Sequence, residues 1–294
     1  MGYRDYSTAK GRIVDSTGHG DFTTIQAAIN AASSGQTVFV RPGTYTENIT
    51  HKAGVNVTAF VGDAENFSVN VVGKWTISGP GTFALSSLTL TTNSDFCISM
   101  GGSDATILHV EDCLIIASNN TAVQYTTANP ASVLVIYNSV VAVDSSQACY
   151  SMSSTGTLSF YENQLVGATT VASNSSAGAV LFFTCQMGWP ISSSGNSGLL
   201  FGNCRNDCAL QNSTCLTITG TGTAKFNNGE MLSGTASAVS IGTGTLAIIT
   251  QTNLESSNTN VLTGAGELRY AFISFSGASS GHNVTTETAL NTLI

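Results

Sequence analysis

Residues 22–35 carry the first regular pattern of apolar positions in the chain. The apolar residues recur with the period of a helix and form one stripe: Ile25, Ala28, Ile29 and Ala32. Thr23 and Gln26 have the spacing of a capping box, in which the Thr hydroxyl and the Gln amide satisfy the first free backbone N–H groups. Gly35 follows as a residue able to end a helix. The pattern therefore predicts one short amphipathic helix, capped by Thr23 and Gln26.

After this segment the apolar period becomes two, which is typical of β-strands. From about residue 81 the alternation recurs in units that open with a small residue, run through a strand, turn at a polar pair and resume. The residues expected to face inward first in each unit are Phe83, Ile107, Val133, Leu158, Val180, Leu199, Ala224, Leu246 and Leu268. Their mean spacing of about 23 residues indicates a solenoid, because a propeller blade is longer. The fixed Leu and Asn pattern of leucine-rich repeats is absent.

The repeat predicts an all-β protein, a right-handed parallel β-helix of about ten coils. The short helix would cover its N-terminal end, which otherwise offers an open strand edge to other chains. We expect three parts: a leader or attachment segment at residues 1–20, the capped β-helix at 21–274, and a C-terminal segment at 275–294 that contacts neighbouring subunits.

Stacked coils place equivalent side chains about 4.8 Å apart, so polar residues at one turn form a ladder. We expect Asp112, Asn138 and Asn163 to form such a structural ladder, with Cys185 and Cys204 continuing the same column. The chain has seven cysteines, and this odd number favours free, buried thiols. The spacing of the last three cysteines fits no zinc pattern, so no metal and no cofactor are expected.

Charge is scarce and unevenly distributed. Only 9% of the residues are charged, and no Lys or Arg occurs in residues 75–204. Nucleic acids and other anionic polymers need clustered basic groups, so the sequence argues against them as partners. No apolar run reaches about 18 residues, so we expect no membrane insertion.

Two carboxylates nevertheless qualify as a low-ranking catalytic pair. Glu111 and Glu162 are expected at equivalent positions two coils apart, with Tyr137 between them as a platform for a sugar ring. Backbones two coils apart lie about 10 Å from each other, close to the roughly 6.5–9.5 Å carboxylate separation of an inverting glycosidase. The competing interpretation is that both are solvated turn residues. His109 is expected in the core.

Two stretches resemble known families. The segments Gly20–Ile29 (GDFTTIQAAI) and Val38–Glu47 (VFVRPGTYTE) resemble the opening of pectin-lyase-like right-handed β-helix proteins, above all of pectinesterases, over about residues 13–62. The Ser- and Thr-rich coils and the ending Ser274–Thr286 are similar to bacteriophage tail spikes and fibres. Pectinesterases combine two aspartates, an arginine and two glutamines in the central coils. No matching Asp motif occurs in this chain, so no catalytic residue carries over.

These resemblances imply a non-enzymatic structural protein of a phage particle. It would be a homotrimeric β-helical spike, fibre or surface appendage, assembled in the host cytoplasm, that contacts other virion proteins and a host-surface glycan. The alternatives are a tail-spike glycoside hydrolase that depolymerises a neutral host glycan through Glu111 and Glu162, and an adhesin that binds the glycan without cleaving it.

Overall fold

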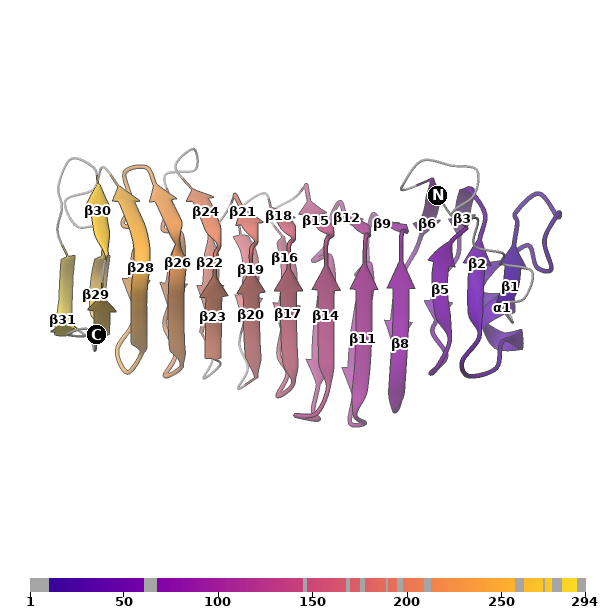
Figure 1. Ribbon diagram of the computed structural model, residues 1–294, viewed down its shortest axis with the longest axis horizontal. Coiled ribbons are helices and arrows are strands. Elements are labelled where there is room, and N and C mark those ends of the chain that lie inside the picture. Colours follow the sequence, from indigo (N-terminus) through magenta and orange to yellow (C-terminus); the bar gives the residue numbers. More distant parts are fainter. Residues whose placement is uncertain are drawn as a thin grey trace.

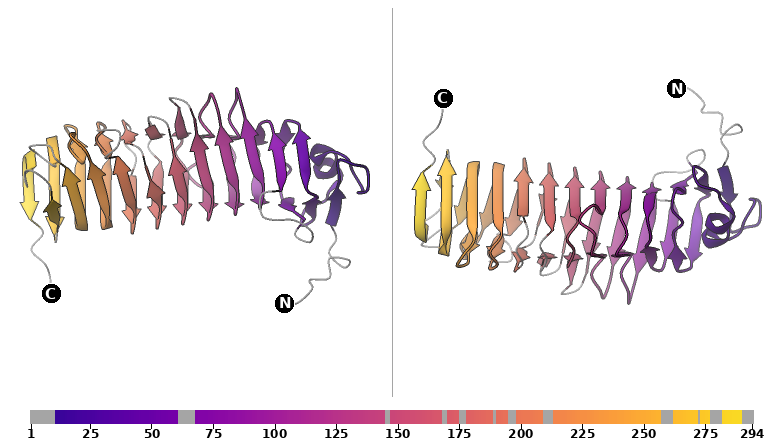
Figure 2. Two further views of the ribbon diagram at one scale, coloured as in Figure 1. Left: turned by 90° about the horizontal axis from the view of Figure 1, so that it is seen from above. Right: turned by 90° about the horizontal axis from the view of Figure 1, so that it is seen from below.

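The chain forms one long, unbranched rod of stacked strands (Figures 1 and 2). The computed structural model describes residues 11–60, 68–144, 147–167, 170–174, 178–188, 190–194, 198–208, 213–256, 262–271, 273–276 and 282–289. Adjacent coils pair in parallel along the whole rod. The predicted parallel β-helix with one short N-terminal helix is confirmed.

Each coil contributes strands to three parallel sheets, which we call sheets I, II and III. Sheet I contains β1 (Gly11–Val14), β2 (Thr37–Val40), β5 (Asn56–Ala59), β8 (Gly81–Ser86), β11 (Thr106–Glu111), β14 (Val133–Tyr137), β17 (Thr157–Tyr161), β20 (Ala179–Phe183) and β23 (Gly198–Gly202). Sheet II contains β3 (Gly43–Thr46), β6 (Val69–Val72), β9 (Thr89–Thr92), β12 (Leu114–Ala117), β15 (Val140–Val143), β18 (Gln164–Val166), β21 (Gln186–Met187), β24 (Arg205–Cys208) and β30 (Ser274–Ser276).

Sheet III contains β4 (Ile49–Thr50), β7 (Trp75–Ile77), β10 (Ile98–Gly102), β13 (Val123–Thr127), β16 (Ala148–Met152), β19 (Thr170–Asn174), β22 (Ile191–Ser193), β25 (Leu216–Ile218) and β27 (Val239–Ile241). Longer strands run across two sheets in the last coils: β26 (Thr223–Ser233), β28 (Leu246–Ser256), β29 (Leu262–Ala271) and β31 (His282–Ala289).

The core is a continuous apolar column inside the coils. Four phenylalanines at one inward position stack along the axis: Phe160, Phe182, Phe201 and Phe226. The rings of Phe182 and Phe201 are parallel to within 4°, with centroids 4.8 Å apart, which matches the spacing of paired strands. Burying each ring contributes roughly 1.5–3 kcal/mol, so the stack is a main source of cohesion between coils.

In eight of the described coils, a single left-handed residue turns the chain from sheet I into sheet II. These residues have φ between 43° and 59° and form what we call the corner column: Ser87, Asp112, Asn138, Glu162, Thr184, Asn203, Asn228 and Gln251. Asn and Asp tolerate this backbone conformation better than most residues, which explains the polar pair that closes each repeat unit.

Helix α1 (Ile25–Ala31) lies at the N-terminal end of the rod, against β1, β2 and β4 (Figure 2). The expected cap residue is wrong by one position, since Thr24 is the N-cap and accepts a hydrogen bond from Ala27 N. The first helical N–H groups, those of Ile25 and Gln26, donate to the Glu47 carboxylate. The Gln26 side chain is therefore free to bind the backbone of Thr50.

Both expected boundaries of the β-helix also need correction. Residues 11–14, assigned to the leader, form β1 and pair in parallel with β2, so the first coil begins there. Residues 1–10 lie outside the described part of the chain. At the other end β31 pairs with β29 as far as Ala289, so strand stacking continues into the expected contact segment. Among the described residues, no helix is both long and apolar enough to cross a membrane.

Candidate active site

Glu111, Tyr137 and Glu162 come together at the edge between sheets I and II. Glu111 ends β11 and lies directly beside Tyr137, which ends β14. Glu162 follows the end of β17 and occupies the corner column, so it is equivalent to Asp112 and not to Glu111. The expected equivalence is therefore wrong. The Tyr137 hydroxyl nevertheless donates to Glu162 Oε2 at 2.9 Å, which links the two coils.

Three carboxylates raise the pKa of the Tyr137 hydroxyl. Its pKa is raised first by the hydrogen bond to Glu162 and by the charge of that carboxylate, and then by the charges of Glu111 and Asp112. Tyr137 is 39% exposed, so the group lies at the surface, where water and a soluble ligand can reach it. A pair of closely placed carboxyl groups is what glycosidic bond cleavage requires.

A hollow of about 260 Å³ adjoins these residues on sheet I. It is lined by His109, Val110, Glu111, Val135 and Tyr137. Its volume is slightly below the roughly 300–1,000 Å³ of typical small-molecule pockets, and it is open to solvent. The expectation of a core position for His109 is wrong, because its side chain is exposed and lines this hollow.

The expected ladder of Asp112, Asn138 and Asn163 is divided between two columns. Asn138 Nδ2 donates to Asp112 Oδ1 at 2.6 Å, and both residues belong to the corner column. Asn163 lies one position further along its coil and points inward. There its side chain accepts from Ser139 N and donates to Ile136 O. Cys185 and Cys204 do follow Asn163 in this inward column, as the backbone hydrogen bonds from Gln186 N and Arg205 N show.

The seven cysteines are buried and free. Burial raises the pKa of Cys97, Cys113 and Cys149 to about 12, because the thiolate would lose its hydration. A hydrogen bond between the thiols of Cys185 and Cys204 raises the pKa of Cys185 further. No group of three or more potential metal ligands occurs among the described residues.

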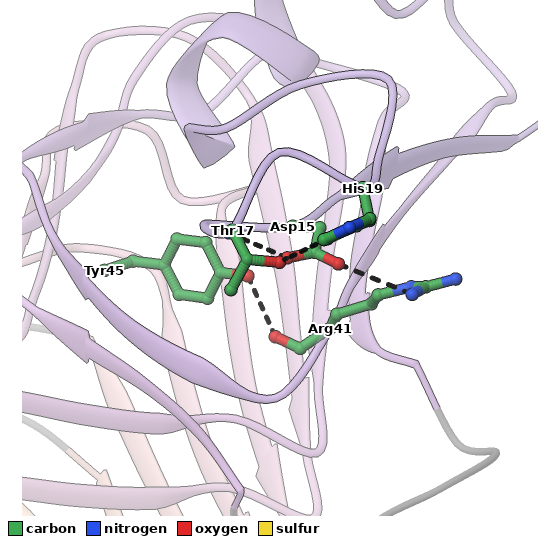
Figure 3. Close-up of polar contacts among 5 residues, drawn as sticks. All are labelled: Asp15, Thr17, His19, Arg41 and Tyr45. Carbon is green, nitrogen blue, oxygen red and sulfur yellow. Dashed lines mark hydrogen bonds and ion pairs between the residues drawn. The ribbon is translucent and has the colours of Figure 1, made fainter.

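A second polar cluster lies beside the first coil (Figure 3). The Asp15 carboxylate accepts from the backbone N–H and hydroxyl of Thr17 and pairs with Arg41 at 3.4 Å. The hydroxyl of Thr17 also meets His19 Nδ1 at 2.9 Å, and the Tyr45 hydroxyl donates to the Arg41 carbonyl. These contacts lower the pKa of Asp15, first through the Thr17 hydroxyl. The Thr17 contacts close the turn after β1, and the Arg41 ion pair ties this turn to the coil that begins with β2, so this cluster anchors a loop.

No protein family and no curated protein sequence matches this chain. Solved structures do match. The A-module of mannuronan C-5 epimerase AlgE4 from Azotobacter vinelandii superposes with a TM-score of 0.65 at 11% identity, over 90% of each chain. The A-module of mannuronan C-5 epimerase AlgE6 from the same organism gives 0.58 at 10% identity, over 92% of this chain and 95% of that one. The catalytic domain of Agl-KA gives 0.57 at 11%, over 90% of this chain and 64% of that chain.

These similarities show that the chain has the fold of a right-handed parallel β-helix. They also contradict the expectation of a non-enzymatic protein, because the matching structures are named as epimerases or as a catalytic domain. At 10–11% identity the likeness shows the fold alone and transfers no residue role. Any reaction must therefore be argued from the residues of this chain.

Proposed function

We propose that this chain is a glycan-cleaving β-helix enzyme that hydrolyses a neutral polysaccharide at Glu111 and Glu162. The observation that supports this most is the convergence of both carboxylates on Tyr137, beside an open hollow. Coils two steps apart place these backbones about 10 Å from each other. That spacing suits a carboxyl pair with room for one water between them, as in an inverting glycosidase.

The hydrogen bond of Glu162 suggests how the two roles are divided. Tyr137 donates to Glu162, so this carboxylate is held as an acceptor and is suited to take a proton from water. The hydroxide attacks the anomeric carbon while Glu111, as the general acid, donates a proton to the departing glycosidic oxygen. The bond between the anomeric carbon and that oxygen breaks as the new carbon–oxygen bond forms. Solvent then returns a proton to Glu111 and removes one from Glu162.

The charge distribution supports a neutral substrate. The catalytic coils lie within the stretch from residue 75 to 204, which contains no Lys or Arg. A polyuronate would meet three carboxylates with no basic group in these coils to balance its charge. A neutral sugar avoids this repulsion and can pack a ring face on Tyr137.

Release of reducing ends from a panel of neutral polysaccharides tests this proposal. We expect activity in the unchanged protein and a loss of at least about 100-fold in Glu111→Gln and in Glu162→Gln, because each removes a proton-transfer group. Gln has the same length as Glu, so it adds no strain at the left-handed position 162. Asp144→Asn, at an exposed position after β15, is the matched control. Equal activity in all variants would overturn the assignment.

The Ser- and Thr-rich coils support a narrower form of the proposal, a tail-spike depolymerase that acts on a host-surface glycan as a homotrimer on a phage particle. Burying small hydroxyl side chains between chains has a low desolvation cost compared with burying charged ones. Sedimentation at micromolar concentration tests the assembly: a mass of three chains supports it, and a mass near 30.2 kDa overturns it.

A further inference from the structure

A second hollow lies on sheet II, around the corner from Glu162. It has a volume of about 200 Å³, and its lining includes Gln164, Val166, Gln186, Gly188, Arg205 and Asp207. These residues come from β18, β21 and β24, which pair in register. Gln164 begins β18 and follows the corner residue Glu162 by two positions in the same coil. The hollow is thus next to the proposed catalytic edge.

Gly188 creates the space in this hollow. It follows β21 and lies between Val166 in one neighbouring coil and Asp207 in the other. A Cβ atom added at Gly188 would meet nothing within 4 Å, and the residue has no left-handed backbone. Neither crowding nor conformation therefore requires glycine at this position. Because glycine has no side chain, a gap remains at this position between the outward-facing side chains of Val166 and Asp207.

The lining combines an apolar surface with a polar rim. Val166 is 37% exposed, which is high for a large apolar side chain in this protein. The amides of Gln164 and Gln186 lie beside each other in adjacent coils and offer both donors and acceptors. An apolar patch with amides at its edge suits a pyranose ring, which has apolar C–H faces and a rim of hydroxyl groups.

The charges of the hollow favour a neutral sugar. The Arg205 guanidinium is 3.3 Å from Asp207 and 3.6 Å from Glu230. The charged residues that line the hollow, Arg205 and Asp207, balance each other, and the guanidinium is held in place by Asp207 and by Glu230 outside the hollow. It can donate to hydroxyl groups of a neutral sugar, whereas a carboxylate-bearing sugar would find its positive charge already paired with two carboxylates.

We propose that the Gly188 hollow is a sugar-binding subsite, which holds a neutral hexose unit of the same chain that is cleaved at the Glu111–Glu162 edge. This inference rests on the proposed function for the identity of the polymer. The glycan would cross the corner column near Glu162 and continue over sheet II, so that binding in the hollow positions the chain for cleavage.

The test measures binding separately from cleavage. The unchanged protein and its variants are run in native gels that contain dextran, a neutral galactan or a neutral mannan, and their retardation gives apparent Kd values. Gly188→Leu fills the hollow, and we expect it to weaken binding at least about tenfold, a loss near 1.4 kcal/mol. Gly198→Leu is the matched control, because a Cβ there also meets nothing within 4 Å and its backbone is not left-handed.

The outcomes separate the subsite from the catalytic proposal. If reducing ends are released but Gly188→Leu binds and cleaves as the parent does, the subsite is wrong and the function stands. If Gly188→Leu loses binding while no polymer is cleaved by any form, the subsite stands and the catalytic proposal falls. Absence of binding to all three polymers by the parent protein overturns the subsite. If Gly188→Leu does not fold, the binding test is repeated with Gln186→Leu. This change removes an amide of the hollow at an exposed position of β21.

Discussion

Asn138 and Asn163 are turn asparagines of successive coils, but their surroundings differ completely. Asn138 is exposed in the corner column, where its side chain meets Asp112. Asn163 is 2% exposed, and its amide satisfies Ser139 N and Ile136 O, two backbone groups that water cannot reach. Buried backbone groups that lose a partner are costly, so the stability of the turn depends on Asn163 more than on Asn138.

We therefore predict that Asn163→Leu lowers the free energy of unfolding by about 3 kcal/mol, because two backbone groups lose their partners. Asn138→Gly should cost less than about 1 kcal/mol, since glycine adopts φ = 43° without strain and only an exposed hydrogen bond is lost. Urea unfolding measures both. Equal losses in the two variants would contradict the assigned roles.

His51 gives the protein a sensitivity to acid. Its ring is buried between Trp75 and Phe83, Nε2 donates to the Val55 carbonyl, and Nδ1 has no partner. Burial lowers the pKa of His51 from 6.5 to about 4, because the charged ring would lose its hydration. Between these values the unfolded chain binds the proton and the folded chain does not, so stability falls as the pH drops from about 6.5 to 4.

The predicted contribution of His51 is a loss of about 2–3 kcal/mol between pH 7 and pH 4.5, at about 1.4 kcal/mol per pKa unit. His51→Gln cannot titrate, so its unfolding free energy should fall less over the same range, even though the variant is less stable at pH 7. Urea midpoints at the two pH values give the comparison. Parallel pH dependence in both proteins would show that His51 ionises equally in the folded and unfolded states.

At the scale of the strand, β20 presents two adjacent phenylalanines to opposite sides of sheet I. Phe182 is buried in the axial stack between Phe160 and Phe201. Phe183 points outward, stacks on Tyr161 with centroids 5.2 Å apart, and lies against Gly202, where an added Cβ would meet its ring at 2.9 Å. The two residues differ only in the side of the strand from which they project.

This contrast predicts very different costs of truncation. Phe182→Ala removes a core ring from a continuous stack and should destabilise the protein by about 3–5 kcal/mol. Phe183→Ala loses one surface ring contact and should cost about 0.5–1.5 kcal/mol. Thermal unfolding of the two variants compares them directly. A larger loss for Phe183→Ala would mean that the register of β20 is shifted by one residue.

The register of the strands is the feature that the sequence pattern does not predict correctly. The repeat itself was readable from the alternation, and inward positions such as Leu158, Val180 and Leu199 are correct. In three coils, however, the pattern predicts Ile107, Val133 and Leu246 as inward, whereas their neighbours Leu108, Leu134 and Ala247 are the buried residues. Both members of each pair are apolar, so the pattern does not decide between them. A slip of one residue moves every side chain to the other face.

This shift of one residue explains why the expected positions of Glu111, Asn163 and His109 differ from the observed ones. Counting from Ile107 aligns Glu111 with Glu162 and Asp112 with Asn163, whereas counting from Leu108 gives the observed corner column of Asp112, Asn138 and Glu162. It also hid the outward position of His109. Only the parallel hydrogen bonds between coils fix the register, and these join residues about 25 positions apart that no local pattern connects.

At the scale of the whole molecule, the β-helix is a rigid support that carries chemistry on its outer surface. In the described part of the chain, the interior between the three sheets is filled by stacked apolar side chains. Both proposed sites lie where outward side chains of different coils meet, at the Glu111–Glu162 edge and in the Gly188 hollow. Rigid coil spacing sets the distance between such groups with little help from loops.

The most direct test is a ¹H NMR time course of a neutral polysaccharide digested by the protein. The proposed pair of carboxylates predicts new anomeric signals whose configuration is inverted relative to the cleaved linkage, followed by mutarotation. Glu162→Gln should produce no such signals in the same time. Signals of retained configuration, or unchanged digestion by Glu162→Gln, would contradict the assignment of Glu111 and Glu162 as the hydrolytic pair.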